Sequence, residues 1–235
     1  MIVLAIVINC YTLYKIAKLV KVMKQTQVVG LGAISVILLG AYFVSVVFTI
    51  QVIKELICLN ASGIIGGTLV TMYIRELSPV VTAIILTGKV ASAFTAEIAV
   101  MKVTKQLDVM YIMNINPIRY LVAPRLFACC VILPLLNILA FFASLSNSIL
   151  ISALLYKIPI VVFSQSINWP LVIIDCFKSL VKSIIFAIVM SLVSCYFGLT
   201  AVSDTKGVGL ATTASVVVIL MLIFITNFIL SLLMF

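Results

Sequence analysis

The sequence predicts an all-α integral membrane protein with five transmembrane helices, an N-terminal interfacial amphipathic helix and a short cytoplasmic helix. Hydrophobic residues make up 65% of the chain and charged residues only 9%, whereas a soluble domain carries about 25% charged residues. Four long runs contain no charge at all. Although the net charge is +9, the Lys and Arg residues form no patch interleaved with aromatic residues. These observations exclude a soluble enzyme and a nucleic-acid-binding domain.

The four charge-free runs predict four membrane spans. They are residues 28–53, 126–156, 183–203 and 207–235. Each exceeds the roughly 18–20 residues that cross a bilayer core. Because lipid offers no partners for backbone N–H and C=O groups, each run is expected to be helical.

A fifth span is harder to place because Arg75-Glu76 interrupts its apolar run. Either residues 56–74 cross the membrane and Arg75 lies in a loop, or one helix covers about 62–88 and holds the charged pair inside the membrane. A basic segment follows at 89–125, and placing it on the same side as the N-terminus requires two spans in between. This favours the single helix. Three glycines on its outer part would permit close helix contact: Gly63, Gly66 and Gly67.

The distribution of basic residues orients the spans. Ten of the 15 Lys and Arg residues fall on the side of the N-terminus, as the positive-inside rule expects: Lys15, Lys18, Lys21, Lys24, Lys89, Lys102, Lys105, Arg119, Arg125 and Lys206. The others fall outside or at membrane depth: Lys54, Arg75, Lys157, Lys178 and Lys182. With five spans, Phe235 at the C-terminus is expected outside.

Residues 1–27 predict an interfacial helix, because the apolar part Met1–Tyr14 is too short to span. One half of the helical wheel carries Lys15, Lys18, Lys21 and Lys24, and the other half carries Ile16, Leu19, Val20 and Met23. That pattern is typical of a helix lying in the membrane surface. The positive charges follow the apolar stretch, which is the reverse of a signal peptide. Residues 1–235 are interpreted as a single domain.

Metal and disulfide chemistry is not predicted. The chain has no His, and its six cysteines form no CxxC pair, so neither a zinc site nor a disulfide framework is expected. The cysteines are Cys10, Cys58, Cys129, Cys130, Cys176 and Cys195. They are interpreted as small apolar residues in helices, and no cofactor is expected.

The basic segment contains a second amphipathic helix, over residues 96–113, before Asn114 and Asn116-Pro117 end it. One side carries Ala99, Val100, Val103, Leu107 and Met110, and the other carries Glu97, Thr104, Lys105 and Asp108. The helix either lies on the bilayer or docks a soluble partner. Mixed charge favours a protein partner, because an anionic lipid surface prefers uniform Lys and Arg.

Arg75 is the most expensive residue to place. It lies 13 residues before Gly88, roughly 20 Å along a helix. Charge inside a membrane is costly and is a functional hypothesis by default. Arg75 either forms a structural ion pair with Glu76, snorkels to the outer interface, or belongs to a cationic site for a lipid phosphate. Pro79, four residues later, is expected to kink the helix.

The stretch Arg75-Glu76-Leu77-Ser78-Pro79-Val80-Val81-Thr82-Ala83 resembles the RELGPV(V/L)TA motif of the MlaE permease family. Similar residues continue through residues 88–93, 96–98, 101–104, 106–108, 116–122, 124–125, 182–183, 207–209 and 211–213. Phe48-Thr49-Ile50-Gln51 resembles the cyanobacterial and plastid branch. Five positions depart from the family pattern: Ser78 and Ala99 replace Gly, Lys89 replaces Arg, Lys105 replaces Glu and Asn116 replaces Asp.

The resemblance implies a homodimeric permease of a lipid-transporting ABC system, working with an ABC ATPase and an MCE-type lipid-binding protein. It implies a lipid cavity, with Lys182 opening the fourth span and Lys178 one turn before it. Two cations beside the single carboxylate of Glu76 would leave an excess of positive charge. The expected cavity residues are Arg75, Glu76, Leu77, Lys182, Phe48 and Gln51. The expected ATPase-coupling residues are Glu97, Lys102, Lys105 and Asp108.

The chain is not expected to hydrolyse ATP itself, because Gly88-Lys89-Val90 lacks the remaining residues of a phosphate-binding loop. The branch resemblance and the Ile, Lys and Asn usage favour a plastid membrane such as the inner envelope, with a bacterial inner membrane as the alternative. A non-transporting membrane scaffold is the main alternative function. A secondary transporter would usually show inverted repeats and midplane acidic residues, and only Glu76 is a candidate for the latter, with Asp175 nearer the outer boundary.

Overall fold

The computed structural model describes residues 30, 32–113, 118–202 and 204–234. The predicted interfacial helix 1–27 and the helix stop at 114–117 lie outside the described residues. All regular structure in the described part of the chain is helical. Five helices are long and apolar enough to cross a membrane, which confirms the predicted fold class: Gly32–Cys58, Ser62–Val103, Tyr120–Tyr156, Trp169–Thr200 and Lys206–Met234.

The second span is built from six consecutive helical pieces. They are η1 (Ser62–Ile64), α2 (Ile65–Met72), the π-helical turn η2 (Tyr73–Leu77), α3 (Ser78–Leu86), the π-helical turn η3 (Thr87–Ala91) and α4 (Ser92–Val103). The span therefore continues well past residue 88, where the sequence predicted its end. The reason is packing, because α4 buries Phe94, Thr95, Ile98 and Ala99 against the fourth and fifth spans.

The third, fourth and fifth spans are formed by α6 (Ala123–Tyr156), α8 (Trp169–Thr200) and α9 (Thr205–Met234). The short elements between the long helices are α5 (Gln106–Ile112), the π-helical turn η4 (Ile118–Val122) and α7 (Ile160–Gln165). The fourth span begins at Trp169, whereas the charge-free run predicted residue 183. Lys182 therefore lies within α8 and does not open it. The prediction was wrong because it let charged side chains end the span, although here they have partners inside the protein.

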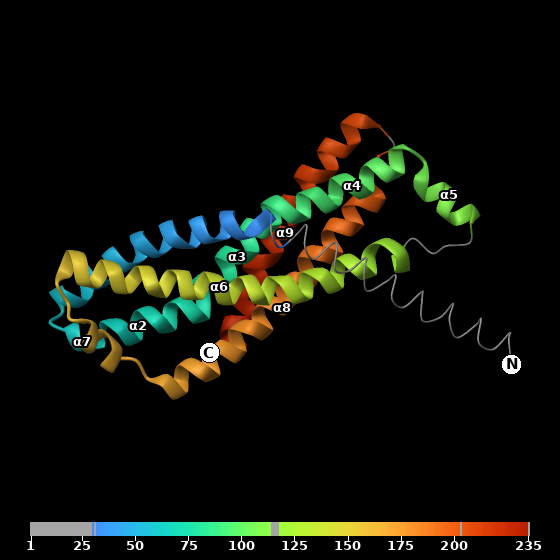
Figure 1. The fold of residues 1–235 in the computed structure, drawn as a ribbon. Helices are drawn as coiled ribbons and strands as arrows, with labels where there is room; N and C mark the ends of the chain where they lie inside the picture. The colour runs from blue at the N-terminus through green and yellow to red at the C-terminus, as the bar shows by residue number, and fades with distance from the viewer. Residues whose placement is uncertain (1–29, 31, 114–117, 203, 235) are drawn as a thin grey trace, which may run out of the picture.

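The prediction of one helix over residues 96–113 was wrong, because the structure has two helices there. The first is the end of α4, which belongs to the second span, and the second is α5. Lys105 separates them, with a φ of 58° in the left-handed region. Figure 1 shows α5 at one end of the helical assembly and α7 at the opposite end.

In the described part of the chain, two larger apolar cores and a small third one around Ile98 hold the helices together. The largest lies where the first span, α3, α4, α6, α8 and α9 meet, with Leu133, Leu136, Phe186 and Ile219 fully or almost fully buried. The second lies toward the α7 end and centres on Tyr73, Leu69 and Phe163. The buried Tyr73 hydroxyl in this core has hydrogen-bond partners. It lies 2.7 Å from the Thr49 hydroxyl and donates to the Ser45 carbonyl at 3.2 Å.

Close contact between α2 and α7 depends on two of the three predicted glycines. A Cβ atom at Gly66 would collide with the Phe163 carbonyl oxygen, and one at Gly67 would lie 2.5 Å from the Ser166 carbonyl oxygen. The backbone amide of Gly67 also donates to the Ser166 hydroxyl at 3.1 Å. Around Gly63 there is open space, so that glycine does not serve helix contact.

Replacing Gly66 with alanine is therefore expected to destabilise the protein by about 1–3 kcal/mol, the usual cost of forcing extra volume into a packed contact. The matched control is Gly63→Ala, which lies in the same helical region and meets nothing. Thermal unfolding of the detergent-solubilised variants provides the measurement. Equal melting temperatures for the two variants would contradict the packing described for α2 and α7.

Candidate functional site

The site begins with a local consequence of the sequence in the second span. Proline has no N–H, so Pro79 cannot donate to the carbonyl of Arg75 four residues earlier. The chain forms the π-helical turn η2 just before this point, a feature frequent at functional sites. The turn carries Arg75 and Glu76, and it leaves the Arg75 carbonyl in need of a donor.

Lys182 of α8 supplies that donor. Its side chain is fully buried, and its ammonium donates to the Arg75 carbonyl at 3.0 Å and to the Ser231 hydroxyl at 3.0 Å. It also pairs with Glu76, with Nζ 3.1 Å from Oε1. A charge this deep is tolerated because every donor direction can meet an oxygen.

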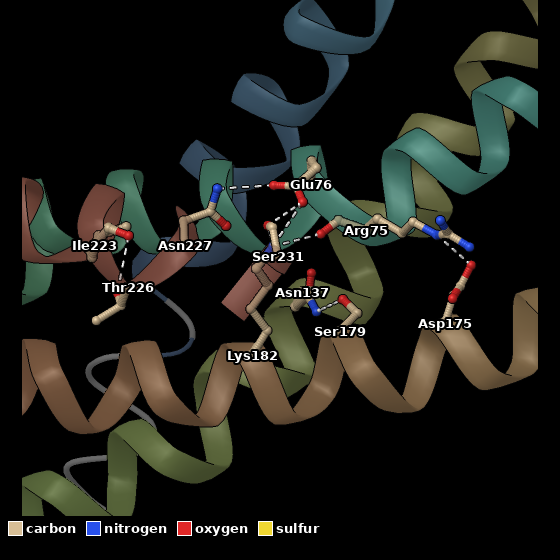
Figure 2. Close-up of polar contacts among 10 residues, drawn as sticks. All are labelled: Arg75, Glu76, Asn137, Asp175, Ser179, Lys182, Ile223, Thr226, Asn227 and Ser231. Atoms are coloured by element: carbon tan, nitrogen blue, oxygen red, sulfur yellow. Dashed lines mark hydrogen bonds and ion pairs between the residues drawn. The ribbon is translucent and has the colours of Figure 1, made fainter. Parts of the chain in front are cut away.

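Two polar residues of α9 complete the environment of Glu76. The Ser231 hydroxyl donates to Oε1 at 2.6 Å, and the Asn227 amide donates to Oε2 at 3.0 Å. Figure 2 shows Lys182 rising from α8 toward Ser231 and Glu76, with Asn227 on the other side of the carboxylate. Glu76 nevertheless remains 44% exposed, so the carboxylate lies at the boundary between the packed interior and the accessible surface.

Arg75 turns toward a different partner. Its Nε lies 2.8 Å from Oδ2 of Asp175, and the Arg75 side chain is 36% exposed while that of Asp175 is 2% exposed. In Figure 2 the Arg75 side chain extends along α8, away from Glu76. The structure therefore pairs Glu76 with Lys182 and Arg75 with Asp175.

The predicted excess of positive charge in this group was wrong. Arg75 and Lys182 supply two cations, and Glu76 and Asp175 supply two carboxylates. We call these four residues the charged cluster. Lys178 lies one turn before Lys182, and its ammonium donates to the Met234 carbonyl at 2.6 Å, near the C-terminal end of α9, where a helix carries partial negative charge.

A buried row of polar side chains joins the second, third and fourth spans near the charged cluster. The Ser78 hydroxyl donates to the Asn137 side-chain oxygen at 2.6 Å, and the Asn137 amide donates to the Ser179 hydroxyl at 2.9 Å. Ser78 stands where the MlaE pattern usually has Gly, and its hydroxyl here links α3 to α6. These hydrogen bonds fix the positions of the second, third and fourth spans around the charged cluster.

The other expected cavity residues have different surroundings from the charged cluster, although Leu77 directly follows Glu76 in η2. Phe48 packs against Tyr73 with ring centroids 6.1 Å apart, and Leu77 packs against the second core. Gln51 lies on the exposed face of the first span, where it borders a shallow groove together with Lys54, Glu55 and Cys58. No hydrogen bond joins Gln51 to the charged cluster in the part of the chain that the structure describes.

The expected coupling residues divide into internal and exposed ones. Glu97 is half-exposed and pairs with Arg125, with Oε2 2.7 Å from Nη2. Lys102 donates to the Leu199 carbonyl at 2.8 Å, where it caps the C-terminal end of α8. Lys105 and Asp108 are exposed, beside the exposed apolar residues Tyr111, Ile112 and Met113 of α5 and its end.

Sequence reasoning gave Asp175, Asn227 and Ser231 no role in the site. Asp175 precedes Lys182 by seven residues, which is two helical turns and places both on one face of α8. Asn227 and Ser231 are polar residues one turn apart in the charge-free part of the fifth span. Both patterns were present in the sequence and would have indicated partners for the intramembrane charges.

Comparison with known proteins places this chain among permeases. The family model described as permease MlaE matches residues 22–233. A probable ABC transporter permease, ycf63 of Pyropia yezoensis, is 46% identical over 212 residues, covering 90% of this chain and 81% of the relative. A probable ABC transporter permease of Synechocystis is 43% identical over 213 residues, covering 91% and 81%. The chloroplastic protein TRIGALACTOSYLDIACYLGLYCEROL 1 of Arabidopsis thaliana is 38% identical over 209 residues, covering 89% and 60%.

Proposed function

The chain belongs to the MlaE permease family, and from that premise we propose that it is the membrane subunit of an ABC transporter that moves phospholipids or related lipids between membranes. The observation that carries the proposal is the charged cluster inside the second and fourth spans. Charges within a membrane are costly and usually mark a substrate path. Arg and Lys are also the side chains that bind phosphate best, Arg through paired N–H donors and Lys as a point charge.

ATP hydrolysis is assigned to a separate subunit. We place its docking site at α5 and the exposed residues Lys105 and Asp108, with Glu97 and Lys102 holding α4 behind them. The apolar side chains of Tyr111, Ile112 and Met113 are exposed beyond the predicted spans, and aromatic residues and Met are enriched in protein interfaces.

The remaining partners and the location follow from the family. The proposal includes a second copy of the chain, an MCE-type lipid-binding protein and a membrane lipid as substrate. The cavity for that lipid would be bordered by Arg75 and Glu76, with Lys182 buried behind Glu76, and with Leu77, Phe48 and Gln51 along its wall. The chloroplastic relative carries the name of a galactolipid, and with ycf63 it favours a plastid membrane over a bacterial inner membrane.

Purified together with its ATPase and lipid-binding partner, the permease is expected to transfer a fluorescent phospholipid between vesicles only when ATP is hydrolysed. The double substitution Tyr111→Gln with Ile112→Gln is expected to release most of the ATPase and to reduce transfer about tenfold or more, because hot-spot side chains at an interface cost at least about 2 kcal/mol when truncated.

The matched control is Ile160→Gln with Val161→Gln, two exposed apolar residues of α7 at the opposite end of the assembly. ATPase retention should be normal in that variant. Assembly of all three subunits without any ATP-dependent transfer would instead support the scaffold function.

A further inference from the structure

The Arg75–Asp175 pair joins a buried carboxylate to a cation that reaches the accessible surface. The contact runs from Nε to Oδ2 at 2.8 Å, with Asp175 almost fully buried and Arg75 about one third exposed. A guanidinium presents five N–H donors in a fixed plane. An anion that arrives at the accessible edge of Arg75 therefore competes with Asp175 for the same positive charge.

We propose that Asp175 is an internal counter-ion that a lipid phosphate displaces from Arg75, so that Asp175 sets how tightly the permease holds an anionic headgroup. The inference rests on the proposed lipid-transport function. A carboxylate and a phosphate accept hydrogen bonds from a guanidinium with similar geometry. A transporter must also release its substrate, and the return of Asp175 to Arg75 supplies the competing charge that drives release.

Charge balance within the cluster gives Asp175 this role and not Glu76. Glu76 is held by three donors, from Lys182, Asn227 and Ser231. Asp175 has Arg75 as its ion-pair partner. Removing the Asp175 charge leaves the Glu76–Lys182 pair in place and converts the cluster from neutral to a net charge of +1. The affinity for an anionic lipid should then rise, while the affinity for an uncharged lipid should not.

Lys178 offers the displaced carboxylate a second partner. It lies three residues after Asp175 on α8, and residues at this spacing are neighbours on a helix surface. A buried carboxylate cannot remain unpaired without a large cost. Exchange of Asp175 from Arg75 to Lys178 would also compete with the Lys178 contact to the Met234 carbonyl, which links headgroup binding to the end of α9.

The test measures lipid retained by the purified complex of permease, ATPase and lipid-binding partner. Wild-type and Asp175→Asn complexes are equilibrated with phosphatidylcholine vesicles that contain equal small amounts of dioleoylphosphatidylglycerol and dioleoylglycerol, and bound lipid is quantified by mass spectrometry. These two lipids share their acyl chains but differ by an anionic headgroup. Asp175→Asn is expected to raise the bound ratio of phosphatidylglycerol to dioleoylglycerol about tenfold, the effect of one competing charge-assisted hydrogen bond, and to slow ATP-driven release.

Lys178→Gln provides an independent variant that leaves the ion pair intact. Without its second partner Asp175 stays on Arg75, so the bound ratio should fall below that of wild type. An unchanged or lower ratio in assembled Asp175→Asn, or an unchanged ratio in Lys178→Gln, would overturn the proposal. So would displacement of phosphatidylglycerol by inorganic phosphate, because the site would then take a free anion.

Arg75→Gln separates this inference from the proposed function. If Arg75→Gln lowers the bound ratio and the Asp175 variant does not raise it, the lipid site stands and the counter-ion role of Asp175 fails. If wild type itself binds phosphatidylglycerol no better than dioleoylglycerol, the headgroup site in the proposed function fails.

Discussion

Replacing Lys182 with methionine is expected to abolish ATP-driven lipid transfer and to destabilise the permease by about 1–3 kcal/mol. Methionine fills a similar volume but donates no hydrogen bond. The Arg75 carbonyl then has no donor from either Pro79 or Lys182, and an unsatisfied buried carbonyl carries a cost of this size. Glu76 keeps Ser231 and Asn227 but loses its cation, so the cluster gains a net negative charge that repels an anionic headgroup.

Lys206→Met is the matched control for this prediction, because Lys206 is an exposed lysine at the start of α9. It should melt and transport like wild type. The measurements are the thermal unfolding midpoint in detergent and phospholipid transfer between vesicles. Transfer at the wild-type rate by Lys182→Met would remove the charged cluster from the transport mechanism.

The five spans could be predicted because an apolar run long enough to cross a bilayer has only one stable form there. The ends of a span could be predicted only where the charged residues that border the apolar run also lie where the packed helix ends. Residues 169–182 belong to α8 because Asp175 and Lys182 pair with residues of η2, which lie 100 and 106 positions away. Residues 92–103 belong to the second span because Thr95 and Ile98 are buried against α8 and α9. No local pattern contains these contacts.

The same reason limits what the sequence predicted about the site. Glu76 and Lys182 were expected together and do meet, and Lys182 also donates to the Arg75 carbonyl, whereas the Arg75 side chain pairs with Asp175. Their pairing could not be predicted, because it depends on the π-helical turn η2, which directs two consecutive side chains to different helices. Glu97 was expected to face a partner protein, yet its carboxylate pairs with Arg125 of α6 inside the chain, a contact that only the folded arrangement of the helices creates.

That pair gives the last prediction, which concerns an asymmetry between its two members. Arg125 is 4% exposed, whereas Glu97 is 50% exposed. The guanidinium carbon of Arg125 lies 5.2 Å from the centre of the Phe94 ring, and its Nη1 is buried with no hydrogen-bond partner among the described residues. Glu97 is therefore the acceptor on which the buried charge depends, while Glu97 itself can be solvated.

Glu97→Ala is expected to destabilise the protein by about 3–5 kcal/mol, because it leaves a buried cation uncompensated. Arg125→Met is expected to cost about 1 kcal/mol, because a hydrophobic side chain of similar length can replace a buried ion without loss of packing. The double variant should be close to Arg125→Met, since the buried charge that made Glu97→Ala costly is gone. Thermal unfolding of the three variants gives the coupling between the residues as a double-mutant cycle.

The double variant also decides whether Glu97 contacts the ATPase directly. It keeps the fold but lacks the carboxylate, so loss of ATPase binding in that variant would assign Glu97 to the docking surface. Normal ATPase binding would mean that Glu97 does not contact the ATPase directly and that its role is to compensate the buried charge of Arg125. Equal destabilisation by Glu97→Ala and Arg125→Met would contradict the burial of Arg125 and remove the reason for treating this pair as a fixed support of the docking helix.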